Sequence, residues 1–352
     1  MSKKRYCAIL MAAAMIMGIS TNAFATTNET PTVATPSITK KLEMAEGLSV
    51  PDATFSFTIE KVTPDAPDLN IAPVVYSLND QKGNPENGKY TISKKSDLQF
   101  GEFPHAGEFA YRITETPGNV PTVTYSTESY YLRVQVANPD QGNLYIKAIT
   151  AEKGSEIGDK QKKVGEIVFT NTYRKSASLS IEKKTEGTLA DKTKFFEFEI
   201  IFTKSPTELQ DNPTYIGKIT TNKEEKEIPV TVGTPAKFSL KDGDKLVFDD
   251  LPAGTKYVVT EMAAEDGYTP KIQVTDNDVT GQWDVGTEKE GLSSNEHYIG
   301  EKNNAVTFIN TYNDVPVTGI IMNNLPFILL IVVAILAFGT LAFLKKRKNS
   351  GK

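Results

Sequence analysis

Cysteine and histidine are almost absent from this sequence of 352 residues, which has one cysteine, Cys7, and two histidines, His105 and His297. A single thiol cannot form an internal disulfide, and a cysteine-based zinc site needs several thiolates. Two histidines far apart in the chain also argue against a histidine-rich metal centre or a histidine-based catalytic site in each half. We therefore expect no metal, no cofactor and no sulfur cross-link in the mature protein.

The sequence also lacks an excess of positive charge. It contains 39 Lys and Arg residues against 44 Asp and Glu residues, for a net charge of -5. A protein that binds nucleic acid normally presents a basic surface, so we expect no DNA or RNA partner. No glycine-rich phosphate loop, nucleophile elbow or pair of catalytic carboxylates stands out, and a turnover enzyme is not expected.

Residues 1–25 have the three parts of a secretory signal peptide. Residues 3–5 are basic, residues 6–19 are apolar, and Ala23-Phe24-Ala25 has the small-x-small pattern that a signal peptidase reads. A membrane-spanning helix is the alternative, but the apolar stretch is shorter than the roughly 20 residues that a span needs. We predict cleavage after Ala25, secretion, and a linker over residues 26–35.

The C-terminal residues 314–352 contain a short motif, an apolar run and a basic tail. The motif is the pentapeptide Val315-Pro316-Val317-Thr318-Gly319. The apolar run over residues 325–344 is long enough to cross a membrane, and the basic residues 345–348 would stay in the cytoplasm. An ordinary single-pass anchor is the alternative. The three parts resemble the cell-wall sorting signal of Gram-positive bacteria, in which a sortase cleaves between Thr and Gly of LPxTG-like motifs; here Val315 replaces the leading Leu.

The body of the chain contains one internal repeat. Three motifs of the first half return about 140 residues later in the same order. The pairs are Phe55–Ile59 with Phe196–Ile200, Tyr111–Glu115 with Tyr257–Glu261, and Phe169–Tyr173 with Phe308–Tyr312. We therefore predict two tandem domains, over residues 36–174 and residues 175–313.

Several segments of each half have the pattern of β-strands, because β-branched and aromatic residues alternate with polar ones between Gly, Pro, Asn and Asp turns. These segments are residues 56–62, 131–137, 143–150, 166–173, 196–202, 245–248 and 305–312. No long helix is predicted outside the two terminal apolar segments. The pattern favours an all-β fold of two tandem immunoglobulin-like β-sandwich domains.

Each half places three polar residues in phase with the apolar residues of a strand-like segment. Side chains of equal parity share one face of a strand, so such a polar residue points into the core. An amine, a carboxyl and an amide meet this test in each half, near its first strand, its middle and its last strand. They are Lys40, Glu115 and Asn171 in the first half and Lys183, Glu261 and Asn310 in the second.

The residues alone allow two interpretations of these triads. Buried Lys and Glu normally pair or become neutral, so each triad can be an ion pair with a nearby amide, or the strand ends can reach the surface. The other interpretation is chemical. A desolvated Lys loses its proton and becomes nucleophilic, while a desolvated Glu keeps its proton, polarises the Asn carboxamide and relays protons as ammonia leaves. The product would be a Lys-Asn isopeptide bond.

The two triads, the Tyr-x-[Ile/Val]-Thr-Glu and Phe-x-Asn-Thr-Tyr motifs and the sorting signal together resemble the streptococcal pilin isopeptide linkage domain family. This family comprises the major backbone pilins of Gram-positive sortase-assembled pili and the related Cna B-type domains. The resemblance covers about residues 36–319. It implies β-sandwiches in which a first-strand Lys is joined to a last-strand Asn and a Glu catalyses closure. The implied bonds are Lys40 to Asn171 with Glu115 as catalyst, and Lys183 to Asn310 with Glu261 as catalyst.

The resemblance also implies a lysine that receives Thr318 of the next subunit, placed shortly before the last strand of the first domain. Lys160, Lys162 and Lys163 lie in that segment. Lys163 is closest to the family position, although its spacing to Asn171 is one residue longer here. A merely solubilising charge run is the alternative. Lys163 is the candidate for the inter-subunit linkage.

These features predict a structural backbone subunit of a sortase-polymerised covalent pilus at the cell wall, with a precursor that is transiently anchored in the membrane. Isopeptide formation would be a single autocatalytic event, without turnover. The expected partners are a sortase, further copies of the chain joined head to tail, minor pilins and peptidoglycan. The alternatives are a wall-anchored adhesin or basal pilin displayed as a single copy, and a surface enzyme carried on sandwich spacers. The compact two-domain body favours the backbone subunit.

Overall fold

The structure, a computed structural model, describes residues 36–138, 143–154, 163–221, 224–263 and 267–313 and a few residues between 329 and 340. The predictions for the signal peptide, the linker, the sorting motif and most of the apolar run therefore fall outside the described residues. Within the described part of the chain, no helix has the length and the apolar character needed to cross a membrane.

The regular secondary structure of the described residues between 36 and 313 consists of β-strands, which confirms the all-β prediction. The first half contains β1 (Ser37–Ala45), β2 (Ala53–Lys61), β3 (Leu69–Ile71), β4 (Val74–Tyr76), β5 (Lys89–Phe100), β6 (Gly107–Thr116), β7 (Val123–Thr124), β8 (Ser129–Ala137), β9 (Tyr145–Lys153), β10 (Lys163–Val164) and β11 (Ile167–Tyr173). The second half contains β12 (Ser176–Glu186), β13 (Phe196–Thr203), β14 (Thr214–Thr221), β15 (Glu224–Thr231), β16 (Ala236–Leu240), β17 (Lys245–Pro252), β18 (Lys256–Glu261), β19 (Tyr268–Asp276), β20 (Val279–Thr280), β21 (Asp284–Val285), β22 (Leu292–Ser293), β23 (His297–Tyr298) and β24 (Ala305–Tyr312).

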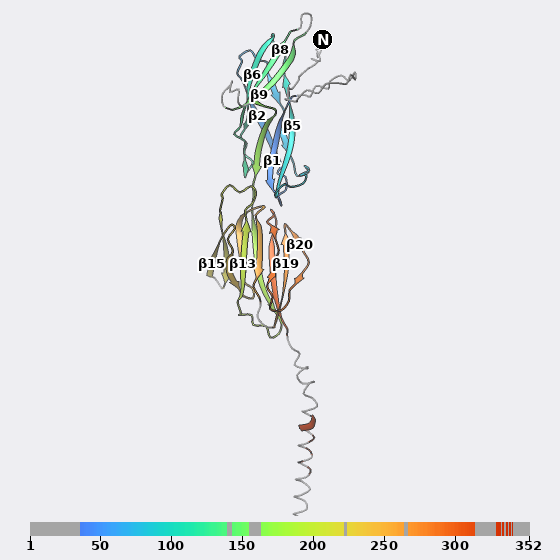
Figure 1. Cartoon of the computed structure of the whole chain (residues 1–352), viewed down its shortest axis with the longest axis vertical. Coiled ribbons are helices and arrows are strands. Elements are labelled where there is room, and N and C mark those ends of the chain that lie inside the picture. Colours follow the sequence, from blue (N-terminus) through green and yellow to red (C-terminus); the bar gives the residue numbers. More distant parts are fainter. Residues whose placement is uncertain are drawn as a thin grey trace, which may run out of the picture.

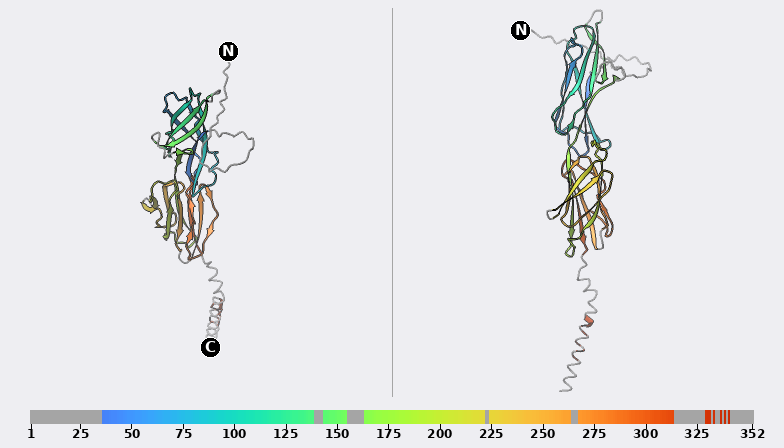
Figure 2. Two further views of the ribbon diagram at one scale, coloured as in Figure 1. Left: turned by 45° about the horizontal axis from the view of Figure 1, so that its top comes forward. Right: turned by 90° about the vertical axis from the view of Figure 1, so that its left-hand side faces the viewer.

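The strands form two sandwiches of two sheets each. The N-terminal sandwich, β1 to β11, has the strand orders β3-β5-β1-β11-β7 and β10-β9-β8-β6-β2-β4. The C-terminal sandwich, β12 to β24, has the orders β15-β14-β17-β12-β24-β19-β20, with β21 beside β19, and β16-β13-β18-β22, with β23 beside β18. The two sandwiches are stacked end to end along the long axis of the molecule (Figure 1), as two further views also show (Figure 2).

The first strand of each sandwich pairs in parallel with the last strand. Along β1 and β11, Lys40 lies opposite Phe169, and Asn171 lies two residues further on. The register of β12 and β24 is equivalent, with Lys183 opposite Phe308. Because residues two apart share one face of a strand, each Lys and its Asn are diagonal neighbours on the inner face of the same sheet.

The facing sheet supplies the carboxyl group. On β6, Tyr111 and Ile113 alternate inward and are fully buried, and the same two-residue period carries Glu115 into the core. On β18, Tyr257 and Val259 lead in the same way to Glu261. Each large apolar side chain buried in this way stabilises the fold by roughly 1.5–3 kcal/mol, so the apolar residues fix the face on which the carboxyl group lies.

The two sandwiches are in direct contact at their junction. Ala253 of the C-terminal sandwich is buried with Ala45 in the hydrophobic core of the N-terminal sandwich. The neighbouring Gly254 has a φ of +83°, and a Cβ atom there would lie 2.5 Å from the Cβ of Ala45, so only glycine fits this approach. The carboxylate of Glu301 accepts from the backbone N–H of Ser49 at 3.2 Å and pairs with Lys175 at 3.3 Å.

Candidate functional site

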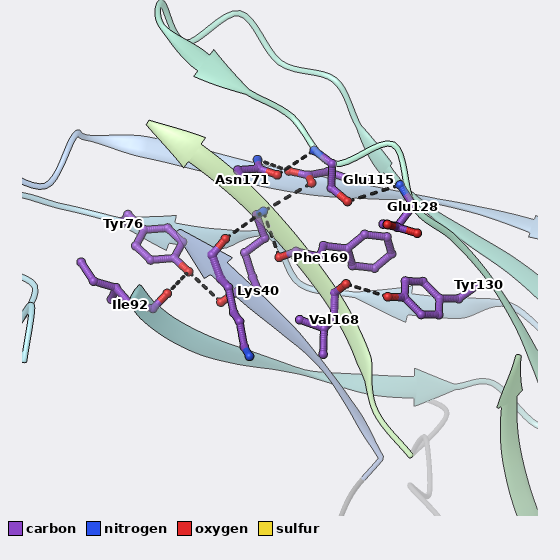
Figure 3. Close-up of polar contacts among 11 residues, drawn as sticks. Lys40, Tyr76, Ile92, Glu115, Glu128, Tyr130, Val168, Phe169 and Asn171 are labelled. Atoms are coloured by element: carbon purple, nitrogen blue, oxygen red, sulfur yellow. Dashed lines mark hydrogen bonds and ion pairs between the residues drawn. The ribbon is translucent and has the colours of Figure 1, made fainter. Parts of the chain in front are cut away.

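The first predicted triad comes together in the core of the N-terminal sandwich, where β1, β6 and β11 carry Lys40, Glu115 and Asn171 (Figure 3). The three residues are 0%, 4% and 0% exposed. Lys40 Nζ donates to Glu115 Oε2 over 3.3 Å, and Asn171 Nδ2 donates to Glu115 Oε1 over 2.6 Å. One carboxyl group therefore holds the amine on one oxygen and the amide on the other.

The Lys40 amine has acceptors for all of its protons. Besides Glu115, it donates to the backbone carbonyls of Phe169 at 3.2 Å and Lys41 at 3.4 Å. An ammonium group has three N–H donors, so the charged form of Lys40 is fully hydrogen-bonded in this core. The ring of Phe55, whose centroid lies 4.7 Å from Nζ, adds a cation-π contact.

The oxygen of the Asn171 carboxamide also has a partner. The backbone N–H of Ser126 donates to Asn171 Oδ1 over 2.8 Å. Sequence reasoning missed this group, because a backbone N–H in a connecting segment leaves no side-chain pattern.

The second predicted triad has the same arrangement of strands in the C-terminal sandwich. Lys183, Glu261 and Asn310 lie on β12, β18 and β24 and are 0%, 1% and 0% exposed. Lys183 Nζ lies 3.1 Å from Glu261 Oε1, and Asn310 Nδ2 donates to the same oxygen over 2.6 Å. In this sandwich, a single carboxylate oxygen faces both the amine and the amide.

Two oxygen atoms of this second triad, Glu261 Oε2 and Asn310 Oδ1, accept no hydrogen bond from the described residues. Lys183 Nζ has its ion pair with Glu261 Oε1 and no further acceptor among these residues. The ring of Phe196, whose centroid is 4.3 Å from Lys183 Nζ, is an apolar neighbour of the amine. Leaving a buried polar group without a hydrogen bond costs about 1–3 kcal/mol, so the unreacted C-terminal triad is a high-energy arrangement.

Burial brings the pKa values of the two groups in each triad toward one another. Desolvation lowers the pKa of Lys40 and of Lys183 to about 8, against the opposing attraction of the neighbouring glutamate. Desolvation also raises the pKa of Glu115 and of Glu261, against the opposing effects of the lysine and the asparagine and, for Glu115, of the backbone N–H of Ser126. Transfer of one proton from Lys to Glu is therefore much easier than in water, and it yields a neutral amine beside a protonated carboxyl group.

A further residue, Tyr76 on β4, holds the backbone at Lys40. Its fully buried hydroxyl donates to the Lys40 carbonyl at 2.7 Å and lies 3.1 Å from the Ile92 carbonyl. Figure 3 shows the ring of Tyr76 beside Lys40. Sequence reasoning missed Tyr76 as well, because a strand of three residues is too short to show a period.

The other predicted site residues are only partly described. Lys163 is exposed on β10, an edge strand, where it lies opposite Glu152 of β9. Lys160 and Lys162 and the motif from Val315 to Gly319 fall outside the described residues. Among the residues that are described, no group of three His, Cys, Asp or Glu side chains is placed to hold a metal ion.

Each half of the chain matches one family model. Residues 36–174 match the family model of the Spy0128-like isopeptide containing domain, and residues 177–312 match a domain family of unknown function. The chain is 28% identical over 327 residues to a pilin of Streptococcus pyogenes serotype M1, over 88% of this chain and 90% of the relative. Over most of its length, the chain is homologous to this streptococcal pilin. The family predicted from the sequence motifs is confirmed for this pilin homologue.

Two further matches are more limited. A segment of 88 residues of the pilin homologue is 42% identical to the pilus tip adhesin Cpa of Streptococcus pyogenes, over 25% of this chain and 12% of the adhesin. The crystal structure of the major pilin from Streptococcus pyogenes is similar at 26% sequence identity and a TM-score of 0.38, over 79% of this chain and 98% of that one.

Proposed function

We propose that this pilin homologue is the structural backbone subunit of a covalent cell-surface pilus, in which each sandwich is locked by a Lys-Asn isopeptide bond. Its pilin relatives support a role as a pilus subunit. The observation that carries the finer proposal is the pair of buried triads, each of which links the first and last strands of a sandwich through a glutamate of the facing sheet. This role is structural, and bond formation would occur once in each sandwich.

The triad itself supplies every atom and proton that the reaction exchanges. After one proton passes from Lys to Glu, the neutral Nζ attacks Asn Cγ, and the carbonyl electron pair moves to Oδ1. The carboxyl group then gives its proton to Nδ2 and the resulting carboxylate takes one of the two protons on Nζ, after which the carbon–nitrogen bond to Nδ2 breaks and ammonia leaves. The lysine amine and the asparagine carboxamide have become one secondary amide and ammonia, and the glutamate ends as a protonated carboxyl group.

The proposed bonds would stabilise the fold mainly by constraining the unfolded chain. Each bond closes a loop of about 130 residues, which the loop-entropy relation for disulfides converts to roughly 5 kcal/mol. A body without a disulfide gains in this way a cross-link that reducing conditions do not break.

Polymerisation would use the two ends of the chain differently. A sortase cysteine would take Thr318 as an acyl group after cleavage before Gly319, while the apolar run and the basic tail hold the precursor at the membrane. Within the polymer, the Thr318 acyl group of one copy would pass to Lys163 of another copy. The Thr318 acyl group of the last copy added would pass to peptidoglycan. Minor pilins would be further partners. Lys163 suits this role because it is exposed on an edge strand and is therefore accessible to a neighbouring subunit.

Intact mass spectrometry tests the internal bonds. The secreted body, residues 26–318, is expected to be lighter than its sequence by two losses of ammonia, each of about 17 Da. Glu115→Ala and Glu261→Ala are each expected to restore one loss, and peptide mapping assigns it to one sandwich. A wild-type mass equal to that of the sequence would refute the internal bonds.

Immunoblots of cell-wall extracts test polymerisation. Thr318→Ala is expected to leave the protein in the membrane as a monomer. Lys163→Arg keeps the positive charge but removes the primary amine, so it is expected to abolish the ladder of polymers while both ammonia losses persist. Lys147→Arg, at another exposed position of the N-terminal sandwich, is the matched control and should give a normal ladder. A normal ladder for Lys163→Arg would exclude Lys163 as the acceptor.

A further inference from the structure

The backbone N–H of Ser126 lies at the carboxamide of Asn171 in the N-terminal triad, and it is also close to the carboxyl group of Glu115. It donates to Asn171 Oδ1 over 2.8 Å, while Asn171 Nδ2 donates to Glu115. A backbone N–H can only donate, so its partner must be the carbonyl oxygen of the amide. The donor therefore faces the atom that gains negative charge when an amine attacks the carboxamide carbon.

The segment that carries this N–H is held in place by contacts of its own. The hydroxyl of Tyr125 accepts from the backbone N–H of Val120 at 3.0 Å, and its ring meets the edge of Phe55 with a centroid distance of 5.8 Å. On the other side, Ser126 Oγ accepts from the backbone N–H of Glu128 at 3.3 Å. The donor is thus oriented before any reaction, which is the condition under which a hydrogen bond to a developing oxyanion is most effective.

We propose that the backbone N–H of Ser126 is the oxyanion-stabilising group for closure of the N-terminal isopeptide bond. The proposal rests on the bond-forming function proposed above and adds a catalytic group to it. When Lys40 Nζ attacks Asn171 Cγ, the electron pair of the carbonyl moves onto Oδ1, and the Ser126 N–H stabilises that charge. The electron pair returns as Nδ2 takes a proton from Glu115 and leaves as ammonia, while Nζ gives one of its protons back to Glu115, so the Ser126 N–H is unchanged at the end.

The C-terminal triad provides an internal reference for this role. Within the described residues, Asn310 Oδ1 accepts no hydrogen bond. Removal of the Ser126 N–H is therefore expected to slow one closure and leave the other as it was, in the same molecule and in the same sample. A general loss of folding would slow both.

The sharpest test replaces the donor alone. In a background of Ser126→Ala, which keeps the backbone N–H, the amide of residue 126 is changed to an ester by incorporating lactic acid in cell-free synthesis. Loss of one oxyanion donor commonly slows catalysis by about 100- to 1000-fold. We expect the ester to slow ammonia loss at Asn171 at least tenfold relative to Ser126→Ala, with closure at Asn310 unchanged. Peptide mapping of quenched samples distinguishes the two sites.

Ser126→Pro removes the same N–H by ordinary mutagenesis and should show the same selective delay. If this variant does not fold, the ester decides. Equal rates at Asn171 for the ester and for Ser126→Ala would overturn the proposal while leaving the isopeptide function intact. The absence of any ammonia loss from the wild-type chain would instead refute the function itself, so the two failures are distinguishable.

Discussion

The two triads have the same residues and the same strand positions, yet their polar atoms are satisfied to different degrees. In the N-terminal triad, Lys40 has three acceptors and the Asn171 oxygen has a backbone donor. In the C-terminal triad, the amine has only its ion pair with Glu261, and one carboxylate oxygen and the Asn310 oxygen accept no hydrogen bond from the described residues. The proposed bond formation would therefore start from a stabilised reactant state in one sandwich and from a less stabilised one in the other.

The difference in hydrogen bonding suggests two ways to favour the proposed bond formation, by stabilising the transition state or by destabilising the reactants. In the N-terminal triad the charged amine of Lys40 is fully hydrogen-bonded. We infer that closure there depends on the Ser126 N–H, which faces the oxygen that becomes negatively charged in the transition state. The C-terminal triad has no such donor in the described part of the chain, but its unreacted atoms are costly to bury, and bond formation removes part of that cost. In both sandwiches the glutamate has to move protons, so burial, which raises its pKa, is the shared requirement.

The largest expected effect comes from removing each bond while keeping the Lys-Glu pair. Asn171→Ala and Asn310→Ala should each lose about 5 kcal/mol of stability by the loop-entropy relation. The loss should be greater for Asn310→Ala, because Lys40 keeps two backbone acceptors and Lys183 has none. Calorimetry should show Tm decreases of roughly 10–20 °C.

Asn70→Ala, at an exposed position on β3, is the matched control and should leave the Tm and both ammonia losses unchanged. Equal Tm decreases for Asn171→Ala and Asn310→Ala would contradict the energetic difference between the triads. An unaltered Tm in both variants would show that the bonds do not stabilise the fold.

The pH dependence of closure is the next largest effect. In the reactive state the Lys-Glu pair shares one proton, which leaves the amine neutral and the carboxyl group protonated. At low pH a second proton binds the amine, which can then no longer attack. At high pH the shared proton is lost, and the carboxylate can then no longer protonate the leaving nitrogen. Since burial lowers the pKa of Lys40 and of Lys183 to about 8, closure in both sandwiches should slow above about pH 8, roughly tenfold per pH unit. On the acidic side of the profile, closure should begin to slow at a pH above the ordinary pKa of a glutamate side chain, because burial raises the pKa of Glu115 and of Glu261.

Chains collected unfolded in acidic urea from cell-free synthesis and diluted into buffers from about pH 5 to pH 10 would give this profile by timed mass spectrometry. An alkaline limb near pH 10.5, the ordinary lysine value, would mean that desolvation does not control the amine.

A smaller effect, confined to one sandwich, is expected for Tyr76→Phe. The lost hydroxyl hydrogen bond to the Lys40 carbonyl should cost about 1–1.5 kcal/mol and slow closure at Asn171 a few-fold. In the C-terminal sandwich a backbone group takes the place of the tyrosine hydroxyl, because the Lys183 carbonyl accepts from the N–H of Gly243 at 2.9 Å. Closure at Asn310 should therefore be unaffected. Tyr90→Phe on β5, whose hydroxyl makes no hydrogen bond with the described residues, is the control, and equal delays in both variants would contradict a specific role.

The residues of the triads were predictable from sequence, and their surroundings were not. A two-residue period fixes the face of a side chain, so Lys40, Glu115 and Asn171 were assigned to the core from their apolar neighbours alone. The Ser126 N–H belongs to a backbone that any residue except proline would supply. Its contact depends on how the segment before β8 folds over the core, which no local pattern records.

The fold was predictable to a similar extent. The strand segments around the repeated motifs were found, because they alternate cleanly between apolar and polar residues. The longest strand of the N-terminal sandwich, β5, was missed, since lysines and serines occupy most of its middle positions. Its place between β1 and β3, rather than its own composition, explains why it is a strand, and such long-range pairing is invisible in a single sequence.

The smallest expected effect concerns the position two residues after each lysine, which faces the asparagine across the parallel strand pair. This residue is Leu42 in the N-terminal sandwich and Thr185 in the C-terminal one. The Thr185 hydroxyl is buried and makes no hydrogen bond with the described residues. Thr185→Val has nearly the same shape and removes an unsatisfied group, so it should be neutral or stabilise the C-terminal sandwich by up to about 1 kcal/mol. A loss of more than about 1 kcal/mol in denaturant unfolding would mean that the hydroxyl has a partner in the bonded protein and that the C-terminal triad is better satisfied than its unreacted geometry indicates.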